Sequence, residues 1–214
     1  MTNLSGPAVK PLLRGHFHQA AFFFAMGACS LLLVDGGVGR IFPLLIYSIS
    51  LCGLLGVSAL YHRKHWQVRG RAWMRRLDHA FIFILIAGTA TPICLWALPP
   101  AEGPFILVVL WAATAVGVLQ SLFWGKAPKW VAAILYVGVG WIVVPYFSDF
   151  QRALSTTQVG LLLGGGIIYT VGAVVYALKK PNPWPPIFGY HEIFHLLVIV
   201  AATFHFVVIY GLSH

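Results

Sequence analysis

The chain alternates between long apolar runs and short polar connections. Seven runs approach the roughly 20 residues that a helix needs to cross the hydrocarbon core of a bilayer, and they cover residues 17–34, 41–61, 80–98, 105–123, 131–147, 159–178 and 193–212. These runs are continuous rather than alternating, which excludes a closed membrane barrel of strands. The pattern therefore predicts an all-α integral membrane protein, a bundle of seven transmembrane helices that forms a single domain over residues 1–214.

The composition agrees with lipid as the main solvent. Hydrophobic residues make up 59% of the 214 residues and charged residues only 9%, whereas soluble domains carry about 25% charged residues. The excess of Lys and Arg, 14 against 5 Asp and Glu, lies between the apolar runs, so we interpret it as a signal of membrane orientation and not of nucleic-acid binding. Three cysteines inside apolar runs, without close spacing, predict neither a disulfide framework nor a thiolate metal site.

Basic residues gather on one side of the predicted bundle. When successive connections are assigned to alternate sides, Arg40 and Arg152 fall on one side and all the others on the opposite side, namely Lys10, Arg14, Arg63, Lys64, Arg69, Arg71, Arg75, Arg76, Lys126, Lys129, Lys179 and Lys180. Because Lys and Arg are retained on the cytoplasmic side, this predicts a cytoplasmic N-terminus and an outside C-terminus. The protein is then a multi-pass protein of the cell (inner) membrane.

Four ionisable residues near the cytoplasmic ends of the predicted helices are the candidate chemistry, because such residues are costly in a membrane span. His62 ends the second run, Asp78 precedes the third, and His191 and His195 stand at the start of the seventh. Residues four apart share one helix face, so His191 and His195 can reach the same metal ion. With His62 they offer three nitrogen ligands and an open position, the arrangement of a catalytic zinc site, although iron and nickel stay open.

Two further side chains complete the predicted site. Asp78 is the candidate catalytic base, placed to hydrogen-bond the metal-bound water and accept its proton. Ser58, one turn before His62, is expected to support the ligands or that water. Asp78 has an alternative role, in which it caps the third helix or pairs with Arg75 or Arg76.

Residues 191–195 also match the zincin motif HExxH, in which Glu192 would be the general base of a metalloprotease. We disfavour this function because no Asp or Glu follows Glu192 to supply a further ligand. Glu192 is expected to face solvent, Lys179 or Lys180 instead. His205 is expected to form a hydrogen bond between helices, and His18 is expected at the membrane interface.

Three groups of residues together resemble the bacterial hemolysin III branch of the progestin and adiponectin receptor (PAQR) family: residues 58–62, residues 77–79 followed by 86–92, and residues 191–195. The resemblance extends over the second to the seventh helix, although Ala90 replaces a bulkier residue that is usual there. It implies a seven-helix bundle with zinc held by His62, His191 and His195, and with Asp78 on the zinc-bound water. The wider superfamily includes hydrolases that cleave lipid amides such as ceramide. The resemblance thus implies a ceramidase-like, zinc-dependent hydrolase of a lipid amide or ester.

Other functions stay open. The second hypothesis is a receptor-like sensor or regulator of membrane state, in which zinc is structural and no lipid is turned over. A pore is disfavoured because no ring of charged residues occurs within the predicted spans. The hydrolase hypothesis takes a membrane lipid as substrate or ligand, and it predicts a cavity that reaches the metal from the cytoplasmic leaflet. The oligomeric state does not follow from the sequence.

Overall fold

A computed structural model describes residues 10–125 and 127–213, and within these ranges the regular structure is helical. The helices are α1 (His16–Asp35), α2 (Ile41–Arg63), α3 (Val68–Ala97), α4 (Glu102–Phe123), α5 (Lys129–Gly140), α6 (Phe147–Ala153), α7 (Thr156–Leu178) and α8 (Tyr190–Leu212), with short 3-10 turns at Val38–Arg40 and Val144–Tyr146. In this part of the chain, seven helical spans are long and apolar enough to cross a membrane. The seven-helix prediction is therefore confirmed.

Two of the predicted helices differ from the observed ones. The fifth run is not one continuous helix, because α5 ends at Gly140 and α6 begins at Phe147. Pro145 explains the break: its ring clashes with the carbonyl of the residue four positions earlier, Trp141, where the turn begins. The third helix begins at Val68, well before the predicted start at residue 80. It carries its basic first turns beyond the apolar run, so Asp78 lies inside α3.

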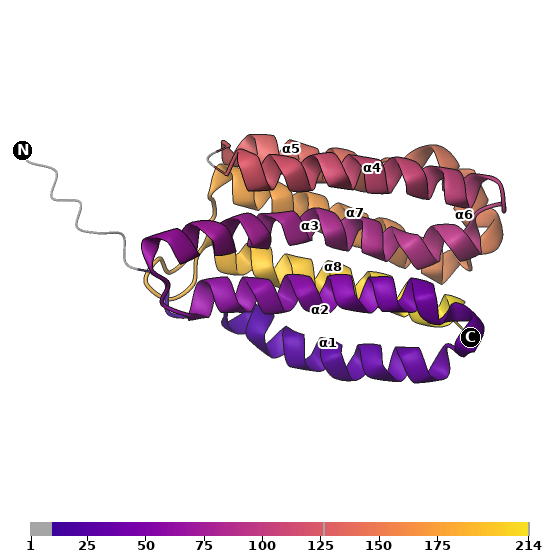
Figure 1. Ribbon diagram of the computed structural model, residues 1–214, viewed down its shortest axis with the longest axis horizontal. Coiled ribbons are helices and arrows are strands. Elements are labelled where there is room, and N and C mark those ends of the chain that lie inside the picture. Colours follow the sequence, from indigo (N-terminus) through magenta and orange to yellow (C-terminus); the bar gives the residue numbers. More distant parts are fainter. Residues whose placement is uncertain (1–9, 126, 214) are drawn as a thin grey trace, which may run out of the picture.

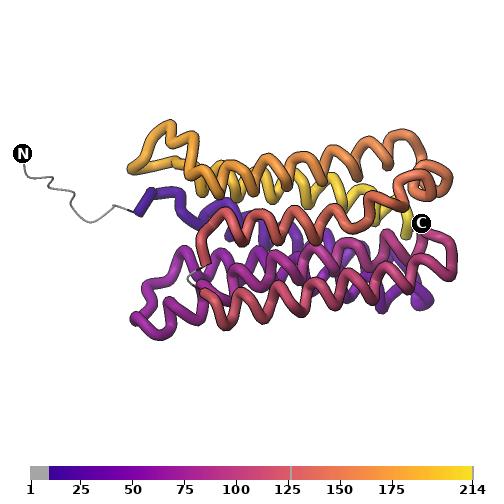
Figure 2. The backbone as a smooth tube through the Cα atoms, turned by 90° about the horizontal axis from the view of Figure 1, so that it is seen from above, coloured from indigo at the N-terminus to yellow at the C-terminus, as the bar shows by residue number. Residues whose placement is uncertain are grey.

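The helices close into a ring of contacts, and α3 also reaches across it to α5 and α8. Figures 1 and 2 show the helices running roughly side by side along the long axis of the molecule. Consecutive helices α1 to α4 pack against one another, α5 packs on α7, α7 on α8, and α8 returns to α1. Helix α3 contacts α2, α4, α5 and α8. Residues from α2, α3 and α8, which are distant in sequence, can therefore share one interior site.

The outside of the bundle is apolar, as a lipid-facing surface requires. Phe24 of α1 is 81% exposed and Phe123 of α4 is 82% exposed.

The first described turn of α1 and the last turn of α8 lie at opposite ends of the molecule (Figure 1). We call the end where α1 and α8 begin the basic end, because the predicted cytoplasmic Lys and Arg residues lie in the segments there; Lys126 lies outside the described residues.

Glycine permits close packing between α7 and α8. A Cβ at Gly165 of α7 would lie 2.4 Å from Nε2 of His205 on α8, so these helices approach closely only because the position has no side chain. Gly138 and Gly140 of α5 differ from Gly165, because a Cβ at either position would meet no described atom within 4 Å.

Candidate metal centre

Three histidine side chains meet where the last turn of α2 faces the first turns of α8. His62, His191 and His195 are 7%, 7% and 1% exposed, so all three are buried. The Nε2 atoms of His62 and His191 are 3.0 Å apart, and one ring nitrogen from each of the three lies within 4.8 Å of the others. The structure thus brings together the three residues that the sequence predicts as ligands.

The chemistry of this cluster fits a metal ion. Two nitrogen ligands of one tetrahedral zinc ion lie about 3.3 Å apart, close to the separation of the His62 and His191 nitrogens. The three side chains offer imidazole nitrogens without a thiolate, a donor set that suits zinc. The three buried histidines could therefore hold a metal ion.

Asp78 of α3 faces the cluster. Its Oδ2 lies 3.9 Å from His62 Nε2, and its side chain is 14% exposed. The hydroxyl-bearing Ser58 is 3% exposed and lies beside the Asp78 carboxylate. Asp78 lies well inside α3, so the prediction that it caps this helix is wrong. Among the described ion pairs, its basic partner is His62 and not Arg75 or Arg76.

His18 of α1 also belongs to the cluster, and the sequence analysis misses it. Its ring stacks on that of His195 with centroids 3.8 Å apart and planes 12° apart. The side chain is only 2% exposed, so the prediction that His18 lies at the membrane interface is wrong. Because α1 begins at the same end as α8, the argument from depth that selects His191 applies to His18 as well.

Glu192 is the second residue whose surroundings differ from the prediction. It is 0% exposed and forms an ion pair with Arg14, which precedes α1. Its Oε2 also accepts a hydrogen bond from the Gly189 backbone N–H at 2.8 Å, which caps the start of α8. The prediction that Glu192 faces solvent or Lys179 and Lys180 is wrong. Both of its oxygens are bound away from the histidines, which disfavours the HExxH protease mechanism.

The segment before α1 lies across the basic end of the site. Lys10 donates a hydrogen bond to the His62 carbonyl, and burial together with the charge of Arg71 lowers the pKa of Lys10. Gly15 has a φ of +85°, and a Cβ at this position would lie 2.6 Å from the Cβ of His62. Glycine is required here both for its backbone angle and for the close approach. The N-terminal segment thus contacts the backbone on which one candidate ligand stands.

An apolar cavity of about 180 Å³ reaches the cluster from inside the bundle. His18, Ser58, Asp78 and His195 line its basic end, and the lining follows α3 as far as Cys94. At a rise of 1.5 Å per residue, Asp78 and Cys94 lie about 24 Å apart along the helix. A water molecule needs about 10 to 15 Å³ of such volume, so the cavity has room for a far larger guest. The sequence predicts a cavity that reaches the metal from the cytoplasmic leaflet. The observed cavity extends much further along the bundle than that leaflet alone.

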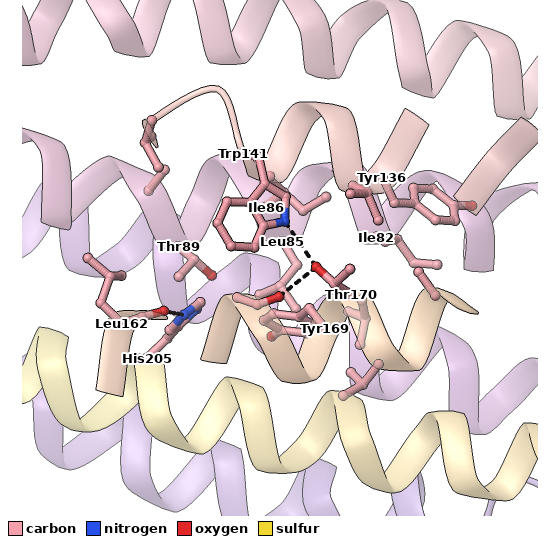
Figure 3. Close-up of a pocket in the computed structure, with 18 of the residues that line it drawn as sticks. Ile82, Leu85, Ile86, Thr89, Tyr136, Trp141, Leu162, Tyr169, Thr170 and His205 are labelled. Atoms are coloured by element: carbon pink, nitrogen blue, oxygen red, sulfur yellow. Dashed lines mark hydrogen bonds between the residues drawn. The ribbon is translucent and has the colours of Figure 1, made fainter. Parts of the chain in front are cut away.

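The middle of the cavity lies among α3, α5, α7 and α8. Figure 3 shows Thr89, Trp141, Tyr169, Thr170 and His205 around this part. His205 Nε2 donates a hydrogen bond to the Leu162 carbonyl at 3.1 Å, which confirms the predicted bond between helices.

Comparisons with known proteins agree on one family. The family described as "Haemolysin-III related" matches residues 8–206. The chain is similar to Hemolysin-3 of Bacillus cereus, with 27% identity over 96% of this chain and 93% of that protein. It is also similar to the Hemolysin-3 homolog of Bacillus subtilis, with 30% identity over 82% of this chain and 80% of that protein. The Adiponectin receptor protein of Drosophila melanogaster is 30% identical over 71% of this chain and 38% of that protein. No solved structure matches the chain.

Proposed function

The chain is a member of the haemolysin-III-related family, and on this premise we propose that it is a zinc-dependent membrane hydrolase that cleaves an amide or ester bond of a lipid. One observation carries the proposal: three buried histidines and a carboxylate stand together at the end of a long apolar cavity. His62, His191 and His195 would hold the zinc ion. When bound, zinc polarises a carbonyl group and makes water a nucleophile at neutral pH.

Asp78 is the proposed proton carrier. Its carboxylate shares the basic end of the cavity with His195 and lies 3.9 Å from His62 Nε2. At this place it would accept a proton from the attacking water and return it to the departing nitrogen or oxygen. Ser58, beside the carboxylate, would orient it through a hydrogen bond. His18 would hold the ring of His195 in one orientation by stacking on it.

The cavity is proposed to bind the acyl chain of the lipid. Its lining beyond the histidines is dominated by side chains of α3, α5 and α7 such as Ile82, Leu85, Ile86 and Leu162. An acyl chain that enters this lining from the bilayer stays in apolar surroundings, because lipid tails are as apolar as the side chains around it. The chain would thereby place its carbonyl group beside Asp78 and the histidines. We place the protein in the inner cell membrane with its basic end in the cytoplasm.

The test combines metal analysis with lipid turnover. Purified wild-type protein is expected to contain about one zinc ion per chain and to release fatty acid from an N-acyl or ester lipid, detected by mass spectrometry. Asp78→Asn should retain zinc and thermal stability but lose turnover by at least about 100-fold. Asp149→Asn is the matched control, because this carboxylate pairs with Arg152 on α6, away from the histidines, and it should leave turnover unchanged.

A structural metal is the second candidate function, because the metal would join two helices that are far apart in sequence. His62 ends α2 and the other two ligands begin α8. In a sensor of membrane state, removal of zinc would lower the melting temperature while no lipid is hydrolysed. That pair of results would favour the sensor over the hydrolase.

A further inference from the structure

Two polar atoms in the middle of the cavity have no partner. Nδ1 of His205 and the hydroxyl of Tyr169 are buried, and neither forms a hydrogen bond within the described residues. Both residues line the cavity, their ring centroids are 5.6 Å apart, and His205 is 9% exposed. A buried polar atom without a partner costs about 1 to 3 kcal/mol. A polar group bound at this pair would remove that cost.

The neighbouring polar groups already satisfy one another. Trp141 Nε1 donates to Thr170 Oγ1 at 2.9 Å, and this hydroxyl donates to the Gly166 carbonyl at 2.8 Å (Figure 3). His205 and Tyr169 are different, because each has a buried atom without a hydrogen-bond partner among the described residues. The guest would bind these two side chains without breaking an existing bond.

The available atoms define the chemistry of the guest. His205 donates through Nε2 to the Leu162 carbonyl, so a neutral ring has only an acceptor at Nδ1. Tyr169 can donate through its hydroxyl. A single hydroxyl group can do both, because it donates one hydrogen bond and accepts others. A plain hydrocarbon chain would leave both atoms unpaired.

The distance to the histidine cluster gives the position of this hydroxyl. His195 and His205 are ten residues apart on α8, which corresponds to about 15 Å along the helix. Carbon–carbon bonds of about 1.52 Å at an angle of about 111° advance an extended chain by about 1.25 Å per carbon. The separation thus corresponds to about twelve carbons. By the same measure, the roughly 24 Å of lining along α3 accommodates a chain of about 19 carbons.

We propose that His205 and Tyr169 form a binding site for a hydroxyl group carried in the middle of the acyl chain of the lipid ligand. The site makes the protein selective for lipids whose chain is hydroxylated about twelve carbons from the carbonyl. This inference rests on the proposed function, because it places the carbonyl at the histidines.

The test compares three fatty acids on the purified full-length protein: octadecanoate, octadecanoate with a hydroxyl at about carbon 12, and octadecanoate with a hydroxyl next to the carboxylate. Dissociation constants would be measured by titration calorimetry in one detergent. The mid-chain hydroxyl should tighten binding at least about tenfold over the plain chain. The hydroxyl next to the carboxylate should bring no such gain, because it lies far from His205.

Two tyrosine variants test the assignment. Tyr169→Phe should reduce the preference for the mid-chain hydroxyl to about twofold or less, since it removes only the oxygen. Tyr47→Phe is the matched control: its hydroxyl is also buried and unpartnered among the described residues, but Tyr47 does not line the cavity. This variant should keep the full preference.

The results bear on the hydroxyl site and on the hydrolase proposal in different ways. Equal affinities for the plain and the mid-chain hydroxylated acids would overturn the hydroxyl site and leave the hydrolase proposal intact. If neither acid binds, the acyl cavity fails, and both proposals lose their basis. A preference that survives in Tyr169→Phe would show that the hydroxyl binds elsewhere.

Discussion

Gly15 offers a sharp test of how the N-terminal segment positions the candidate metal centre. Its φ is +85°, and an added Cβ would lie 2.6 Å from the Cβ of His62. Alanine at a positive φ costs about 1 to 2 kcal/mol. Carbon atoms prefer separations of about 3.5 to 4.0 Å, so Gly15→Ala would also push His62 away by about 1 Å.

The second effect acts on His62, one of the candidate metal ligands. Displacement of a group that positions a ligand commonly reduces metal affinity by about 10- to 100-fold. Gly15→Ala should therefore lower the free energy of unfolding by at least about 1 to 2 kcal/mol and weaken zinc binding by one to two orders of magnitude. The measurement is a zinc titration against a competing chelator, together with thermal unfolding of the same detergent-purified protein.

Gly37→Ala is the matched control. Its φ is also positive, at +71°, yet a Cβ there would meet no described atom within 4 Å. Backbone strain of about 1 to 3 kcal/mol is expected in this variant as well, but zinc affinity should match the wild type. Wild-type zinc affinity in a folded Gly15→Ala protein would refute the reasoning, and so would an equal loss of affinity in both variants.

Further predictions concern an ion pair and two helix glycines. Arg14→Met leaves the buried Glu192 charge without its partner and should lower the free energy of unfolding by about 3 to 5 kcal/mol. Arg152→Met breaks an exposed pair and should lower it by at most about 1 kcal/mol. Chemical unfolding of both variants would measure the difference, and equal losses would contradict a buried pair. Gly165→Ala places a Cβ 2.4 Å from a histidine of α8 and should lower the melting temperature, while Gly138→Ala meets no described atom and should stabilise α5 by up to about 1 kcal/mol. A neutral Gly165→Ala variant would show that α7 and α8 can separate without cost.

The local pattern of the sequence predicts the spans and much of the site. Apolar runs of about 20 residues predict the seven helical spans, because each span has to present apolar side chains to the lipid and satisfy its own backbone hydrogen bonds. The i and i+4 spacing of His191 and His195 places them on one face whatever surrounds the helix. Even the break after α5 has a local cause in Pro145, although the apolar run conceals it.

Other features depend on contacts between distant segments. Glu192 is oriented by Arg14, 178 positions away in the sequence, and His18 reaches His195 only because α1 packs against α8. Hydropathy describes how each residue interacts with lipid or water, and it does not specify which helices become neighbours. For this reason the distribution of Lys and Arg, which predicts the orientation of the bundle, does not predict the partner of Glu192.

The amino-acid sequence by itself determined the number of spans, the shared depth of His62, Asp78, His191 and His195, and the family resemblance. The tertiary structure alone decided that the N-terminal segment lies over His62, that Glu192 is buried, and that a cavity joins the histidines to His205. The physical reason is that helix periodicity and membrane burial act along the chain, within one span. A cavity and an ion pair between distant segments exist only once α1, α3, α7 and α8 have packed together.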